Sequence, residues 1–198
     1  MGTHVIVQKR GHGGPAYKTP SHRFISPAKY PQYKENMLGE ITGFVQDPSK
    51  DVVLAELLFS DGRKGYLIAA EGMKAGDVIQ LGGKTPLATG NVCTLETIPE
   101  GISVFNVEAH SGDGGKFART SGAFAMVVSH DEDTGAAGIL LASKKVMSLK
   151  QGCRATIGVA SGGGRLEKPM KKAGIGKKNR ESRNKRWPRK LGTSMSAY

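Results

Sequence analysis

Between residues 36 and 164, apolar positions recur in short runs that glycine, proline and aspartate interrupt every few residues. Runs of four to eight such positions, bounded by turn residues, are typical of β-strands. The first series predicts four strands, over 38–45, 52–59, 65–69 and 78–81. Asp47-Pro48-Ser49 and Ser60-Asp61-Gly62 have the composition of tight turns between them. Short strands at this density fit a small barrel of the oligonucleotide-binding kind, over residues 36–90.

A second series of apolar runs follows Ile98-Pro99-Glu100-Gly101. It predicts five more strands, over 103–107, 124–129, 139–142, 145–148 and 155–159. The spacing again favours a small barrel, over residues 91–164, joined to the first near Gly90-Asn91. No helical repeat is visible in either half. The sequence therefore predicts an all-β chain with two consecutive barrels.

The two ends of the chain have a different composition. Residues 1–35 carry four prolines between Pro15 and Pro31, together with glycine, histidine and basic residues, which predicts an extended arm. Aromatic side chains alternate with cations in this arm, a combination that can stack on bases and pair with phosphates. Residues 165–198 carry twelve Lys/Arg against two Glu and few apolar positions. Both ends are predicted to be basic, non-globular extensions of the barrels.

The net charge of +12 is therefore unevenly distributed. The first 35 residues contribute +5, the middle contributes −3 and the last segment contributes +10. Basic segments gain affinity for a polyanion by releasing counterions from its phosphates, so we expect a nucleic-acid partner. Two solvated tails are the alternative. Glycine, at 28 of 198 residues, has about twice its usual share of about 7%, which favours tight turns and close backbone approach.

Several classes of protein are disfavoured by what the sequence lacks. It has no uncharged apolar stretch of membrane-spanning length, and its N-terminus lacks the apolar core of a signal peptide. Cys93 and Cys153 lie sixty positions apart without metal-ligand spacing, which favours a reduced intracellular chain. The five histidines have no ligand spacing with either cysteine. We therefore expect no membrane, no metal, no cofactor and no small-molecule substrate.

Three enzyme-like signatures do not hold. The glycine-rich segment 112–116 is followed by Phe117, where a phosphate loop requires serine or threonine. Residues 131–135 resemble half a calcium loop, but the glycine comes one place early, so a hairpin turn is favoured. Ser129, His130 and Asp131 are adjacent, and neighbours on a strand point to opposite faces, so they cannot form a triad. The sequence predicts no catalytic residue and no enzyme.

Two glycine-rich segments remain as candidate contacts with a phosphate backbone. In residues 112–122, small residues surround Lys116 and Arg119, so a phosphate could approach both backbone and side-chain donors. In the second segment, Arg154 and Arg165 flank the glycine run of residues 158–164. Arginine can make a two-pronged contact with phosphate, and glycine lets the backbone pass close to RNA. An inter-strand loop and a plain linker are the respective alternatives.

The order of short motifs along the chain resembles one family over almost its whole length. These motifs are Ala69-Ala70-Glu71-Gly72, Gly90-Asn91, Ile98-Pro99-Glu100-Gly101, the 112–122 loop, Gly162-Gly163-Gly164-Arg165, Lys168-Pro169, Lys172-Ala173-Gly174 and Trp187-Pro188. They are similar to the ribosomal protein L-two family, the universal second protein of the large ribosomal subunit, in its archaeal form. That family continues beyond its Trp-Pro segment with an Asp-His-Pro run. We therefore expect a member that lacks this C-terminal end.

The resemblance implies an oligonucleotide-binding-fold (OB-fold) barrel followed by an SH3-like barrel in a structural constituent of the large ribosomal subunit. It also implies that the chain binds large-subunit rRNA near the peptidyl-transferase region and supports subunit association. The expected partners are neighbouring ribosomal proteins and the small subunit, and the expected location is the ribosome in the cytoplasm. It assigns rRNA contact to Arg23, Lys116, Arg119, Arg154, Arg165, Lys168 and Lys172. The composition of the extensions adds Arg10, Lys18, Lys171, Lys177, Lys178, Arg183, Arg186, Trp187 and Arg189. The alternative is a free-standing single-stranded nucleic-acid-binding or architectural protein with the same barrels.

Overall fold

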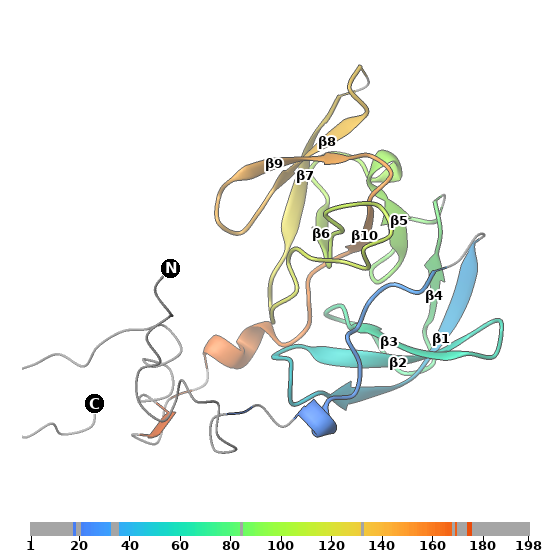
Figure 1. Cartoon of the computed structure of the whole chain (residues 1–198), viewed down its shortest axis with the longest axis vertical. Helices are drawn as coiled ribbons and strands as arrows, with labels where there is room; N and C mark the ends of the chain where they lie inside the picture. Colours follow the sequence, from blue (N-terminus) through green and yellow to red (C-terminus); the bar gives the residue numbers. More distant parts are fainter. Residues whose placement is uncertain are drawn as a thin grey trace, which may run out of the picture. The chain divides into compact units, whose positions relative to one another are not determined.

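Ten β-strands make up most of the regular structure in the computed structural model (Figure 1). It describes residues 18, 21–32, 36–83, 85–131, 133–167, 169 and 174–175. The chain divides into two units, Met1–Gly163 and Gly164–Tyr198, and all ten strands lie in the first. In that first unit, strands pair in the order β3-β2-β1-β4-β5-β10-β6-β7-β8-β9. The all-β prediction is confirmed.

The first four strands form an antiparallel group around one apolar core. They are β1 (Met37–Gln46), β2 (Val53–Phe59), β3 (Lys64–Ile68) and β4 (Val78–Leu81). The first half of β1 alternates buried and exposed positions, as expected for a strand with one face on a core. Ile41, Leu57 and Leu81 are almost fully buried in this core. The turn into β3 contains Gly62 at a φ of +79°, a conformation that glycine adopts without steric cost.

The remaining six strands surround a second apolar core. They are β5 (Val92–Thr94), β6 (Ser103–Phe105), β7 (Ala125–Asp131), β8 (Ala136–Leu140), β9 (Val146–Lys150) and β10 (Arg154–Ile157). Among the described residues there are also three short 3₁₀ helices: η2 (Ser21–Arg23) in the arm, η3 (Leu95–Thr97) after β5 and η4 (Gly163–Leu166) after β10. Val104, Val127 and Ile139 are fully buried in this second core.

All nine strands expected from the apolar runs are present, with ends shifted by a few residues. The sequence missed β5, because Val92–Thr94 is too short to stand out as a run. It also placed the start of β8 late, since Ala136, Ala137 and Gly138 have little intrinsic preference for strands. Pairing with both β7 and β9 holds these small residues in the sheet.

The two groups of strands join in two places. One is the parallel contact of Leu81 with Val92, between β4 and β5. The other lies beyond β10, where Glu71 N donates to Val159 O at 2.9 Å and Ser161 N donates to Ala69 O at 3.0 Å. A third apolar cluster fills this junction with residues from both groups: Ala28, Val52, Leu54, Ile68, Ala70, Phe105 and Ala160. The boundary near residue 90 falls between β4 and β5 and stays a prediction.

Part of the N-terminal arm belongs to this junction. The sequence predicts an extended basic arm as far as residue 35, yet Ala28 is fully buried and Tyr30 is 3% exposed. The Tyr30 hydroxyl donates to Asn106 O at 2.8 Å and lies 2.6 Å from Thr156 Oγ1. Tyr30 N donates to Gly114 O at 3.2 Å. Burial raises the pKa of Tyr30. The Tyr30 ring therefore belongs to the hydrophobic core, although the sequence predicted that the aromatic side chains of the arm would stack on bases.

We expect Tyr30→Phe to lower the free energy of unfolding by about 1–3 kcal/mol, because it leaves the buried Asn106 carbonyl and Thr156 hydroxyl without their partner. Urea unfolding followed by circular dichroism measures this change. The matched control is Tyr66→Phe, whose hydroxyl lies 3.4 Å from Glu56 Oε1 in a half-buried setting; its effect should stay within about 0.5 kcal/mol. Equal effects of the two variants would contradict the structural role of Tyr30.

Candidate nucleic-acid interface

A fully buried carboxylate, Glu108, lies beneath the glycine-rich loop. It accepts three hydrogen bonds from Arg154: from Nη2 at 2.6 Å, from Nε at 3.0 Å and from the backbone N–H at 2.9 Å. Two more come from the loop backbone, from Gly112 N at 3.2 Å and from Gly114 N at 3.0 Å. A buried charge needs this degree of pairing to be tolerated. Glu108 thus ties the loop to β10.

The pKa of Glu108 reflects this environment. Burial by itself raises the pKa, but the hydrogen bonds from Arg154 and from the Gly114 N–H outweigh it, so the pKa lies below its ordinary value of 4.5. The same balance holds for Asp113 in the loop, where hydrogen bonds from the N–H groups of Gly115, His110 and Ala109 outweigh burial and lower the pKa. Both carboxylates are therefore ionised at neutral pH.

Five backbone donors of the loop are satisfied from within the chain, which limits one expectation. The sequence suggested that backbone N–H groups of residues 112–122 donate to phosphate. In the structure, the N–H groups of Gly112 and Gly114 donate to Glu108, and that of Gly115 donates to Asp113. Those of Lys116 and Phe117 donate to Val107 O. An RNA phosphate can therefore be contacted by side chains of this loop, and not by these five donors.

Arg154 lies inside the folded unit. It is 9% exposed; beyond its bonds to Glu108, its Nη1 donates to Pro31 O at 3.0 Å. Its guanidinium carbon lies 5.2 Å from the centre of the Tyr30 ring, within cation–π range. This position gives Arg154 a structural role, linking the arm to β10. Its contact with rRNA stays a prediction.

Arg119 also bonds to the chain, at the rim of the same loop. Nη1 donates to Gly115 O at 3.1 Å, and Nη2 donates to Pro27 O at 2.8 Å and to Ala28 O at 3.1 Å. Desolvation lowers its pKa. Within the part of the chain that the structure describes, its Nε has no hydrogen-bond partner. Arg119 thus fixes the arm against the loop while its side chain remains half-buried.

A groove beside the loop combines cations with aromatic rings. This loop groove has a cavity volume of about 320 Å³ and is lined by Lys116, Phe117, Ala118, Arg119, Thr120, Ala123, Phe124, Leu141, Ala142 and Ser143. No carboxylate lines it. Phe124 is 43% exposed, and an adjoining hollow of about 230 Å³ shares it. Aromatic rings next to cations form the typical surface for stacked, single-stranded nucleotides.

The two phenylalanines of this groove were not predicted as contacts from the sequence. The apolar pattern placed Phe124 at the start of a strand, and Phe117 stood out only as the residue that breaks a phosphate-loop motif. An aromatic residue next to a glycine-rich basic loop is the signal that could have identified them.

Among the residues that the structure describes, no group of three or more His, Cys, Asp and Glu could hold a metal ion. None of the described helices has the length and apolar character needed to span a membrane.

Three further candidate rRNA contacts are exposed: Lys18, Arg23 on η2 and Arg165 on η4. Arg165 belongs to the second unit. The structure brings Lys116 and Arg119 together in the loop groove and places Arg154 beneath the loop. Outside the described residues lie Arg10, Lys168, Lys171, Lys172, Lys177, Lys178, Arg183, Arg186, Trp187 and Arg189.

The glycine run after β10 packs against the chain itself. An added Cβ at Gly163 would lie 3.3 Å from Gly122 Cα, and one at Gly162 would lie 3.3 Å from Ser121 Cβ. Gly158 has a φ of +114°, and an added Cβ there would lie 3.0 Å from Thr89 Cγ2. The close neighbours of Gly158, Gly162 and Gly163 are parts of the same chain. The expected approach of this run to RNA stays a prediction.

Two groups of strands, each with its own core, and a cationic groove with one exposed aromatic ring, that of Phe124, define a nucleic-acid-binding β-barrel protein. Two family profiles match the chain. "Ribosomal Proteins L2, RNA binding N-terminal domain" matches residues 5–81, and "Ribosomal Proteins L2, C-terminal domain" matches residues 88–198. The chain belongs to the ribosomal protein L2 family. The expected OB-fold barrel followed by an SH3-like barrel is thereby confirmed.

Individual relatives agree with the family profiles. The chain is 42% identical over 199 residues to "Large ribosomal subunit protein uL2" of Halorubrum lacusprofundi, covering all of this chain and 82% of the relative. It is 39% identical to the proteins of the same name from Methanopyrus kandleri, over 202 residues and 82% of the relative, and from Methanocaldococcus jannaschii, over 202 residues and 83% of the relative. Both alignments cover the whole of this chain. The archaeal type of the family is confirmed.

We expect Glu108→Gln to cost about 3–5 kcal/mol of stability at neutral pH, because it leaves the Arg154 charge buried without its partner. The native carboxylate has a pKa below 4.5, so its contribution is complete above that pH and is lost as the pH falls through the folded-state value. Urea unfolding at a series of pH values measures this. The difference between the wild type and the variant should shrink in acid; a constant difference would contradict the ion-pair account.

We expect Gly163→Val to destabilise the first unit by about 1–3 kcal/mol, as overpacking does, because its side chain meets the Gly122 backbone. Gly164→Val is the matched control, since an added Cβ there meets nothing within 4 Å. Thermal unfolding and rRNA affinity are measured for both. If Gly163→Val unfolds like the wild type but binds rRNA poorly, the glycine serves RNA and the packing account is wrong.

Proposed function

We propose that this protein is a structural constituent of the large ribosomal subunit that binds large-subunit rRNA through the loop groove and its basic extensions. Membership of the ribosomal protein L2 family supports this role. The observation that carries it is the loop groove, in which Lys116, Arg119 and two phenylalanines line one cavity without any carboxylate. A groove of this kind attracts phosphates and offers rings to unstacked bases.

Different residues of the loop groove contact different parts of the RNA. Lys116 is exposed, so its amine is available to neutralise a phosphate. Phe124 presents its ring for stacking, which is worth about 1–3 kcal/mol per base. Glu108 and Asp113 fix the backbone of residues 112–115, directly before Lys116, before RNA arrives. A groove that is already formed loses less conformational entropy on binding than a flexible segment.

The further roles of the family come to this chain as part of the same proposal. It would lie near the peptidyl-transferase region, support subunit association, contact neighbouring ribosomal proteins and the small subunit, and reside on the ribosome in the cytoplasm. We assign it no catalytic step, since RNA and not this chain carries the chemistry. Arg23, Lys116, Arg119, Arg154 and Arg165, with the cations of both ends, are proposed rRNA contacts.

Co-sedimentation tests the role directly. A tagged copy of the full chain is expressed in an archaeal host, and sucrose gradients are run after washing ribosomes at high salt. We expect the chain to stay with the large subunit. Release into the soluble fraction at moderate salt, with general affinity for single-stranded nucleic acid, would favour a free-standing architectural protein instead.

We expect the affinity for a large-subunit rRNA fragment to fall about 10³–10⁵-fold between about 50 and 200 mM salt, if six to ten phosphates are neutralised. Lys116→Ala should make the slope of log affinity against log salt shallower by about 0.7–0.9, the contribution of one phosphate. Lys74→Ala, an exposed lysine of the β3–β4 turn, is the control and should leave the slope unchanged. Equal salt slopes for the wild type and both variants would show that Lys116 does not contact the RNA.

A further inference from the structure

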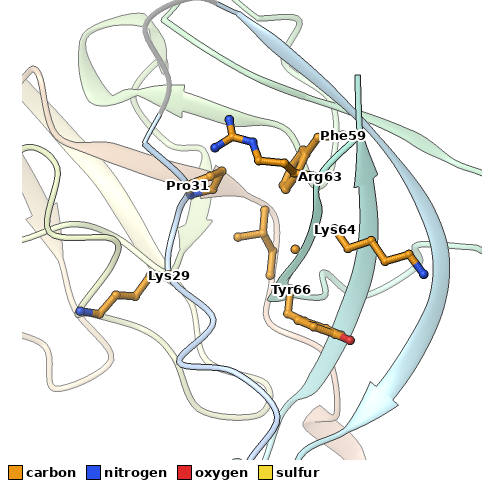
Figure 2. Close-up of a pocket in the computed structure, with 8 residues that line it drawn as sticks. Lys29, Pro31, Phe59, Arg63, Lys64 and Tyr66 are labelled. Carbon is orange, nitrogen blue, oxygen red and sulfur yellow. The ribbon is translucent and has the colours of Figure 1, made fainter. Parts of the chain in front are cut away.

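A second basic hollow lies between the arm and strands β2 and β3, apart from the loop groove (Figure 2). This arm hollow has a cavity volume of about 130 Å³. Its lining residues are Lys29, Pro31, Phe59, Arg63, Lys64, Gly65, Tyr66 and Leu67. None of the lining residues is acidic, and the residues that β2, β3 and the turn between them contribute were not assigned to RNA from the sequence.

The floor of the arm hollow is apolar and its rim is cationic. Phe59 and Leu67 are 5% and 4% exposed, so they form a closed floor. Lys29, Arg63 and Lys64 are exposed at the rim. Arg63 already pairs with Asp61 at 2.5 Å. Among the described residues, Lys29 and Lys64 have no side-chain hydrogen bond or ion pair, so their charges are uncompensated there.

The directions of these side chains decide what kind of anion fits. In Figure 2, the amines of Lys29 and Lys64 point away from each other, on opposite sides of the hollow. One small anion cannot meet both, which excludes a site for a single phosphate ion. A chain of phosphates that crosses the hollow can meet both. A cavity of about 130 Å³ is also smaller than the about 300–1,000 Å³ of typical small-ligand sites.

We propose that the arm hollow receives one nucleobase of a single-stranded rRNA segment, whose flanking phosphates contact Lys29 on one side and Lys64 on the other. The apolar floor of Phe59 and Leu67 suits the face of a base, whereas the cationic rim suits its charged backbone. A duplex keeps its bases stacked inside, so it cannot fill the hollow. This inference rests on the proposed function, because it adds a second contact with the same rRNA.

The test uses the full chain and two probes, a 12-residue oligouridylate and an RNA duplex of equal length. The variant Lys29→Ala/Lys64→Ala is compared with the control Lys74→Ala/Lys150→Ala, which removes the same charge from two exposed lysines elsewhere. For the single strand, the first variant should make the salt slope shallower by about 1.4, or about 0.7 per phosphate. The control should match the wild type, and thermal unfolding verifies that each variant is folded.

Crosslinking gives a second readout that does not depend on variants. An oligouridylate containing 4-thiouridine should crosslink to residues 63–67, and the duplex should not. Equal salt slopes for the two double variants, or crosslinks only elsewhere, would overturn the arm hollow while leaving rRNA binding intact. If the wild-type chain fails to bind a large-subunit rRNA fragment at all, the proposed function fails, and this inference with it.

Discussion

The buried carboxylate of Glu108 is the constraint on which the rest of the structure depends. An unpaired charge in an apolar interior is costly, so the chain must bring donors to it from two places. Arg154 comes from β10, and Gly112 and Gly114 come from the loop. Arg154 in turn bonds to Pro31 and so reaches the arm. One ion pair therefore sets the shape of the loop and the attachment of the arm.

The structure divides the cations of the first unit into two kinds. Arg154 and Arg119 donate to carboxylate and carbonyl oxygens of the chain, which suits a planar group with several fixed donors. Lys116, Lys29 and Lys64 lie exposed, which suits a compact and strongly hydrated charge. Basic composition alone therefore overstates how many cations of the barrels meet RNA, because some of them hold the protein together.

The strands could be predicted from the sequence because each apolar run is local, and β2 and β4 were located almost to the residue. The site could be predicted only in part. Lys116 was found because the loop around it is local. The structural role of Arg154 could not be predicted, because its partner Glu108 lies 46 residues away and no local pattern links the two residues. For the same reason, the contact of Gly163 with Gly122 depends on how β10 folds back over the loop.

The docking of the arm also has a consequence for the order of events during synthesis. Tyr30 is bonded to Thr156, which lies 126 positions later in the chain. At about 5–20 residues per second, the ribosome adds that partner roughly 6–25 s after Tyr30. The arm cannot dock in its final position before β10 has been synthesised. It is therefore the first part of this unit to be made but among the last to fold. The nascent arm is thus accessible to chaperones or to RNA throughout that interval.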